Sequence, residues 1–135
     1  MSTYTAEEQK AIDVISSYEK AVNGGDAAAT AALYATDAAF YPIDFPTAKG
    51  KDAILGSSNA FFDVLLLNIK FTIDEVTVSG DLATVLSHSE GTRYLKPPVD
   101  QTIPEINRET FVLKKIDGEF KIQNYMFNKP AAAGA

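Results

Sequence analysis

The chain has 135 residues, a formal net charge of −6 and 46% hydrophobic residues, as expected for one globular domain. It contains no cysteine and one histidine, which excludes disulfide scaffolds, thiolate zinc sites, cysteine nucleophiles and multi-histidine metal sites. The acidic balance and the presence of only two arginines argue against a surface built for nucleic acid or anionic membranes.

The sequence also lacks the features of membrane insertion or secretion. Its first residues have neither the basic segment nor the apolar core of a secretory signal. The longest central apolar run, Val64–Leu67, is far shorter than a bilayer span. We therefore expect a cytoplasmic protein that contacts neither a membrane nor nucleic acid.

Three helices are expected in the first half of the chain. Thr5 and Glu8 have the spacing of a capping box, and apolar residues then recur at helical spacing as far as Val22. Two glycines end this helix, and Asp26 can cap the next one. The second helix is expected at 27–34, and the third begins near Lys51 and continues through Leu65.

The second half of the chain is rich in β-branched residues and predicts long strands. Turn signals at Gly80-Asp81 and Asp117-Gly118 separate these strands, and Pro97-Pro98 interrupts the chain between two of them. Strands are expected at 37–41, 70–79, 82–96, 105–116 and 119–128.

This order of elements predicts an α+β fold. Three N-terminal helices would pack on a strongly curved antiparallel sheet, giving a cone-shaped barrel with an internal pocket. Residues 1–128 would form a single domain, and residues 129–135 a flexible tail.

Several segments of the sequence resemble the nuclear transport factor two-like superfamily, which includes ketosteroid isomerase and the SnoaL-like cyclases. The resemblance covers residues 7–128 and is carried by a helix–Gly–Asp–helix opening, the start of the third helix and the closing hairpin. These segments are residues 18–26, 32–41, 50–54, 109–113 and 117–122. The resemblance implies the fold, but this fold hosts isomerases, dehydratases, cyclases, hydrolases and non-enzymes.

Ketosteroid isomerase implies roles for particular positions. Tyr18 matches its oxyanion-hole tyrosine, and Glu109 falls at its second oxyanion donor. Pro42 stands where its general base would be, and Asp44 follows two residues later. Steroid isomerisation itself is therefore not implied.

Strand alternation places His88 on the cavity face of its strand, together with Leu86, Glu90 and Thr92. His88 is the only imidazole, and its usual pKa suits general-base work, so His88 or Asp44 is the candidate base. The side chains expected to shape the binding cavity are those of Phe61, Leu86, Glu90, Phe111, Gln123, Tyr125 and Phe127.

Each candidate also has a purely structural interpretation. Tyr18 fits a core tyrosine whose hydroxyl finds one partner, and His88 fits an exposed strand histidine. Glu90 and Glu109 fit solvated strand charges, and Asp44 fits a solvated loop.

Two functions remain open at this point. The first is proton transfer next to a carbonyl group, in isomerisation, dehydration or cyclisation, on a small apolar or aromatic ligand and without a cofactor or metal. Tyr18 and Glu109 would then stabilise the oxyanion. The second is a non-catalytic ligand-binding module or dimeric association module, which the proline at position 42 favours.

The pattern also predicts a homodimer and a perturbed carboxyl group. Small residues in the alternation Ala83, Val85, Ser87 and Ser89 are expected on the outer face of the sheet, where they would permit close contact between two sheets. Burial beside apolar neighbours should raise the pKa of Glu109, whereas a salt bridge from Arg93, if it pointed inward, would lower it.

Overall fold

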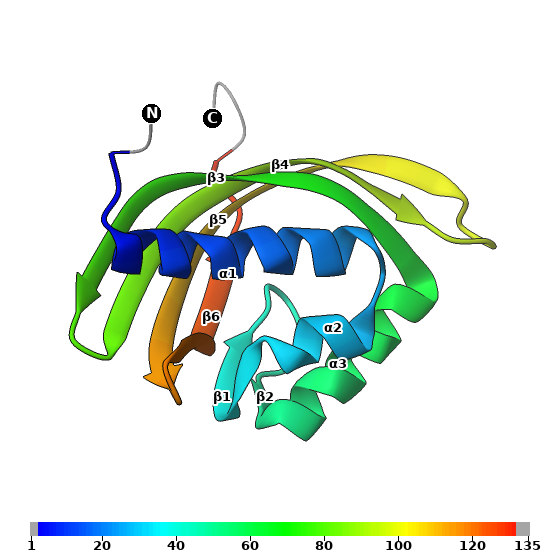
Figure 1. Ribbon diagram of the computed structural model, residues 1–135. Helices are drawn as coiled ribbons and strands as arrows, with labels where there is room; N and C mark the ends of the chain where they lie inside the picture. Colours follow the sequence, from blue (N-terminus) through cyan, green and yellow to red (C-terminus); the bar gives the residue numbers. More distant parts are fainter. Residues whose placement is uncertain (1–2, 132–135) are drawn as a thin grey trace.

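The computed structural model describes residues 3–131 and shows three helices packed on one curved six-stranded sheet (Figure 1). The strand order is β2-β1-β6-β5-β4-β3. The α+β prediction is confirmed, with two refinements. The sheet stays open instead of closing into a barrel, and β1 pairs parallel to β6.

The helices begin and end close to the expected residues. The helices are α1 (Ala6–Asn23), α2 (Ala27–Ala32) and α3 (Lys51–Val64). The capping box at the start of α1 is present, because Thr5 and Glu8 each bond the other's backbone N–H. Helix α2 ends earlier than expected because Tyr34 already belongs to a strand.

Most strands are longer than the sequence pattern indicates. The strands are β1 (Tyr34–Tyr41), β2 (Ala48–Lys49), β3 (Leu65–Ser79), β4 (Leu82–Leu95), β5 (Gln101–Ile116) and β6 (Glu119–Asn128). The long strands β3 to β5 arch over α1, while α2 and α3 lie together near β1 and β2 (Figure 1). This arrangement leaves the concave side of the sheet facing the helices.

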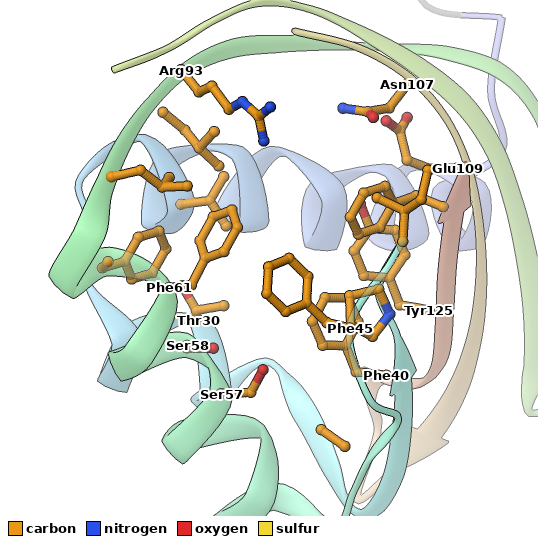
Figure 2. A pocket seen from close by; sticks show the side chains of 18 of the residues that line it. Thr30, Phe40, Phe45, Ser57, Ser58, Phe61, Arg93, Asn107, Glu109 and Tyr125 are labelled. Carbon is orange, nitrogen blue, oxygen red and sulfur yellow. The ribbon is translucent and has the colours of Figure 1, made fainter. Parts of the chain in front are cut away.

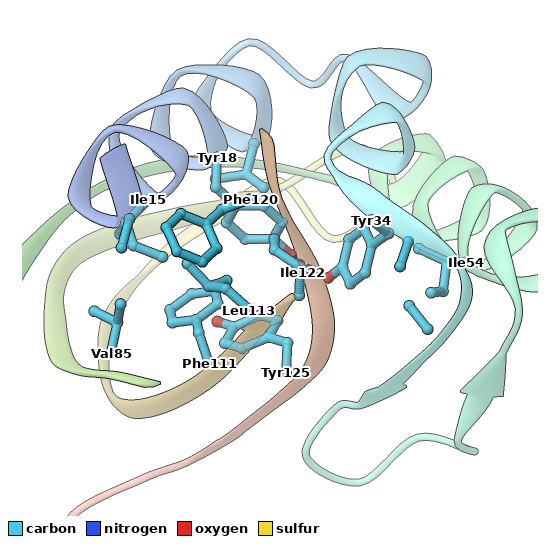
Figure 3. Packing of buried hydrophobic residues seen from close by; sticks show 14 of the residues in the cluster. Ile15, Tyr18, Tyr34, Ile54, Val85, Phe111, Leu113, Phe120, Ile122 and Tyr125 are labelled. Atoms are coloured by element: carbon cyan, nitrogen blue, oxygen red, sulfur yellow. Dashed lines mark hydrogen bonds between the residues drawn. The ribbon is translucent and has the colours of Figure 1, made fainter. Parts of the chain in front are cut away.

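Aromatic side chains form the centre of the core (Figure 3). The rings of Phe111 and Tyr125 are stacked, with centroids 4.1 Å apart, and Tyr18 meets both of them edge-on. Edge-to-face and offset arrangements suit the ring quadrupoles and add to the gain from burial. Helix α1 is thereby fixed to β5 and β6 through Tyr18.

The expected outward face of β4 is wrong. Ala83, Val85, Ser87 and Ser89 are all buried and lie on the concave face. The small side chains therefore leave room for α1 and the aromatic core beneath the sheet, and they are not available to a second sheet. The homodimer stays a prediction without this support.

None of the helices in the described part of the chain is long and apolar enough to cross a membrane.

Gly91 of β4 is paired with Ile69 of β3, and its φ of +155° is one that other residues rarely adopt. A Cβ at this position would collide with the carbonyl oxygen of Asn68 and lie 2.8 Å from the Cα of Ile69. Both neighbours are backbone atoms, so the strand itself would have to move. The glycine therefore permits the local path of β4.

Gly91→Ala should lower the free energy of unfolding by about 2 kcal/mol or more, because of overpacking and backbone strain. Gly56→Ala is the matched control, since Gly56 is an exposed residue of α3 with open space around it. That change should raise the free energy of unfolding by about 0.5–1 kcal/mol. Urea denaturation measures both values, and equal stability of Gly91→Ala and the wild type would contradict this account.

Candidate functional site

A cavity of about 490 Å³ lies between the concave face of the sheet, α3 and the loop at 42–47 (Figure 2). Most of its wall is apolar. Rings and aliphatic side chains from β1, the loop, α3, β3 and β6 supply this part, among them Phe40, Phe45, Phe61, Phe62, Leu67, Phe71, Tyr125 and Phe127. Concave apolar sites with a few polar groups are typical of small-molecule binding.

Glu109 on β5 is the most deeply enclosed carboxyl group of this wall, with 3% of the residue exposed. The hydroxyl of Ser87 donates to its Oε1 at 2.7 Å, and the hydroxyl of Ser89 donates to its Oε2 at 2.5 Å. The strand pairing brings these groups together, because Ser87 lies directly opposite Glu109. Both carboxyl oxygens therefore accept a hydrogen bond from β4.

Burial raises the pKa of Glu109 above its ordinary value, and the hydrogen bonds from Ser89 and Ser87 partly oppose that shift. The direction agrees with the sequence-based expectation. Arg93 does point into the cavity, but its ion pair is with Glu105, so the expected competing salt bridge to Glu109 is not formed. A carboxyl group with a raised pKa can exchange a proton more readily near neutral pH than an ordinary glutamate.

Tyr18 also borders the cavity, and its hydroxyl lies 3.0 Å from that of Tyr34. This hydrogen bond uses one of the two phenolic protons, so the other proton has no acceptor among residues 3–131. If Tyr34 donates, the proton of Tyr18 is free for a ligand. Burial, as the largest effect, raises the pKa of both tyrosines, so both stay protonated donors.

A strip of polar side chains continues from Glu109 along the concave face (Figure 2). The ammonium group of Lys129 donates to both oxygens of Glu105, at 3.2 and 3.1 Å, and Asn107 donates to one of them at 3.3 Å. Arg93 lies at the other end of the strip. The tail expected at 129–135 thus begins with a residue engaged at the cavity, while residues 132–135 lie outside the described part of the chain.

The placement of His88, Leu86 and Glu90 on the cavity face is wrong. All three are exposed on the convex face, because the inward positions of β4 are the odd-numbered ones from Ala83 to Ser89. His88 Nδ1 lies 2.9 Å from the carboxylate of Asp74, and this hydrogen bond raises the pKa of His88. His88 therefore cannot reach a ligand in the cavity. Thr92, expected on the same face, is not among the lining residues either.

Three other expected positions also differ. Asp44 is exposed in the loop, while its neighbours Ile43 and Phe45 line the cavity. Gln123 is the extra residue of a bulge between β5 and β6, which ends the strict alternation, and its amide donates to Asp37. Phe111 is fully buried against the ring of Tyr125 and supports the wall from behind.

The structure brings Tyr18, Phe61, Glu109, Tyr125 and Phe127 to the cavity, as the sequence predicts; their functional roles stay predictions. The sequence did not identify several other residues that line the cavity. They are Phe40, Phe45, Ser89, Arg93, Glu105, Asn107 and Lys129. The alternation of Glu105, Asn107 and Glu109 on β5 could have identified three polar groups on one face.

No group of three or more His, Asp or Glu side chains within the described residues is arranged to hold a metal ion.

Comparisons with known proteins agree with this architecture. The model of the SnoaL-like domain family matches residues 14–122. No curated protein matches the chain.

Solved structures with the same fold are numerous. A ketosteroid isomerase-like protein from Erwinia carotovora atroseptica SCRI1043 is 27% identical, with a TM-score of 0.88 over 96% of this chain and 100% of that chain. A nuclear transport factor 2-like superfamily protein from Salmonella enterica is 18% identical, with a TM-score of 0.81 over 94% and 93%. A domain of unknown function with a cystatin-like fold from Nostoc punctiforme is 20% identical, with a TM-score of 0.76 over 96% and 81%.

Replacing Glu109 should change how stability depends on pH. Because the pKa of Glu109 is raised in the folded state, ionisation is less favourable there than in the unfolded chain. The wild type should therefore lose stability relative to Glu109→Gln as the pH rises from below the ordinary value of 4.5 through the raised folded pKa. Urea denaturation at a series of pH values measures the difference.

Glu90→Gln is the control, since it removes a carboxyl group from the exposed convex face. The raised pKa of Glu109 would be contradicted if the stability difference between Glu109→Gln and the wild type stayed constant across this pH range. It would also be contradicted if that difference changed in the opposite direction.

Proposed function

The chain belongs to the SnoaL-like domain family, and from this premise we propose that its cavity binds a small apolar ring compound with a carbonyl group and moves a proton beside that group. One observation carries the proposal. A carboxyl group with a raised pKa, Glu109, borders a cavity whose other walls are mainly aromatic.

The proton transfer can be described with groups of this chain. Ionised Glu109 accepts a proton from the carbon next to the carbonyl, and the electron pair of the broken C–H bond moves toward the carbonyl oxygen, giving an enolate. With Tyr34 as the donor in the hydrogen bond between the two tyrosines, Tyr18 donates its own proton toward that oxygen. Glu109 then returns the proton to the same or another carbon of the enolate.

This scheme changes the role that the resemblance implies for Glu109. Both of its oxygens already accept hydrogen bonds from serine hydroxyls, an arrangement that suits the ionised carboxylate. Glu109 is therefore better suited to act as the base, and the stabilisation of the oxyanion is left to Tyr18. The ketosteroid isomerase-like name of the Erwinia protein supports the same class of chemistry.

A non-catalytic binding protein is the second candidate. The observation that favours it is the position of His88 and Asp44, both exposed outside the cavity. Glu109 alone would then have to remove and return the proton, since Glu105 is paired with Lys129. A binding protein needs the same cavity but no such shuttle.

Proton exchange with solvent distinguishes the two candidates. In D₂O the wild type should catalyse deuterium incorporation next to the carbonyl of 2-tetralone, followed by proton NMR. Glu109→Gln should slow the catalysed exchange by about 10²–10⁴-fold, the usual contribution of a general base. Tyr18→Phe should also slow the exchange, because the enolate oxygen loses its donor.

His88→Gln is the matched control and should exchange at the wild-type rate, because His88 faces solvent on the convex side. Binding of 2-tetralone without catalysed exchange would favour the binding protein. Loss of exchange in His88→Gln together with full exchange in Glu109→Gln would contradict the assignment of the base.

A further inference from the structure

We propose that Arg93 is an anion-binding residue of the cavity and that the ligand is an apolar compound carrying a carboxylate. This inference rests on the proposed function only in that the cavity must bind a small molecule. It adds a charged group to the ligand and names the residue that recognises it.

The first observation is that the guanidinium of Arg93 is poorly satisfied within the protein. Its Nε is buried and makes no hydrogen bond, and the ion pair with Glu105 has an N–O separation of 3.5 Å. Among the described residues, the buried Nε therefore has only this loose ion pair as a partner. A buried N–H donor without a good acceptor costs free energy, and a ligand oxygen that reaches this Nε would recover it.

The second observation is that Glu105 is already neutralised by another group. Lys129 donates to both of its oxygens, and Asn107 adds a third hydrogen bond. The positive charge of Arg93 is therefore only weakly compensated. The side chain of Arg93 is only 34% exposed, so water hydrates its charge incompletely as well.

The third observation is the direction of the side chain. Arg93 lies on β4, four residues beyond Ser89, and borders the cavity together with Phe61 and Leu65. Figure 2 shows its guanidinium turned inward at one end of the cavity, with Glu109 toward the other end. An anion inside the cavity would meet the donors of Arg93 directly.

A carboxylate fits this arrangement better than a phosphate. The planar guanidinium matches a carboxylate through two parallel hydrogen bonds. A doubly charged phosphate would need more than one cation, but Lys129 is engaged with Glu105. The carboxylate of Glu105, 3.5 Å from Nε of Arg93, would also repel a second negative charge.

The positions of the polar groups define the remaining part of the ligand. Ser89, which holds Glu109, and Arg93 are about 13 Å apart along an extended strand. An apolar ring between Phe45, Tyr125 and Phe127 would span the space between them. The ligand class is therefore an apolar ring acid, with its carboxylate at Arg93 and its ring extending toward Glu109.

Two matched probes test this inference, 2-naphthylacetate and its neutral amide, 2-naphthylacetamide. Their fluorescence can report binding because the chain contains no tryptophan. The wild type should bind the acid about 10- to 100-fold more tightly than the amide, the range expected for hydrogen bonds to a charged group. Arg93→Met should abolish this preference and still bind the amide.

Two further variants complete the experiment. Arg108→Met removes the same charge from the exposed side chain that donates to Asn128, so it should keep the preference for the acid. Arg93→Lys keeps the charge without the planar fork and should retain part of the preference. If Arg93→Met does not fold, as judged by circular dichroism, Arg93→Lys and Arg108→Met still test the claim.

Each other outcome is informative. Equal binding of acid and amide to the wild type overturns the role of Arg93 and leaves a cavity for neutral ligands. The role of Arg93 is also overturned if Arg108→Met loses the preference for the acid as fully as Arg93→Met does. The same holds if Arg93→Lys and Arg93→Met both keep the full preference for the acid. If neither the acid nor the amide binds to the wild type, the binding cavity itself is contradicted, and with it the proposed function.

Discussion

Two hydroxyl groups from β4 hold the carboxyl of Glu109 against an aromatic cavity, and the chemistry that we assign to this chain depends on that contact. The cavity alone would disfavour the charged carboxylate, and the donors of Ser87 and Ser89 partly restore it. The balance leaves a group that can both take and release a proton. Without the pairing of β4 with β5, Glu109 would be an unpaired buried carboxyl group.

The sequence predicts the helices of this fold better than it predicts which face of a strand points into the cavity. Capping residues, glycines and turn signals predict the helices well because their effects are local. The face of a strand is a tertiary property, and β4 carries polar residues on both faces. Ser87 and Ser89 looked like an outer face because they are small, but they are small because the aromatic core lies beneath them.

A usable signal for the face of β4 was nevertheless present. Leu95 and Gln101 flank the turn between β4 and β5 and are paired in the structure. Continuing this pairing along the hairpin places Ser87 opposite Glu109, and directly opposed residues share a face. Once Glu109 is assigned to the cavity, His88 must therefore point outward. The bulge at Gln123 has no comparable signal, because an inserted residue changes the alternation without changing the composition.

The titration of the Glu109 side-chain carboxyl carbon by NMR is the most direct test of this account. In the free protein the midpoint should lie above the ordinary value of 4.5. In Ser89→Ala the midpoint should be higher still, because that variant removes a hydrogen bond to the ionised form. A midpoint at or below 4.5 in the wild type would contradict the account, since Glu109 would then be an ordinary ionised side chain.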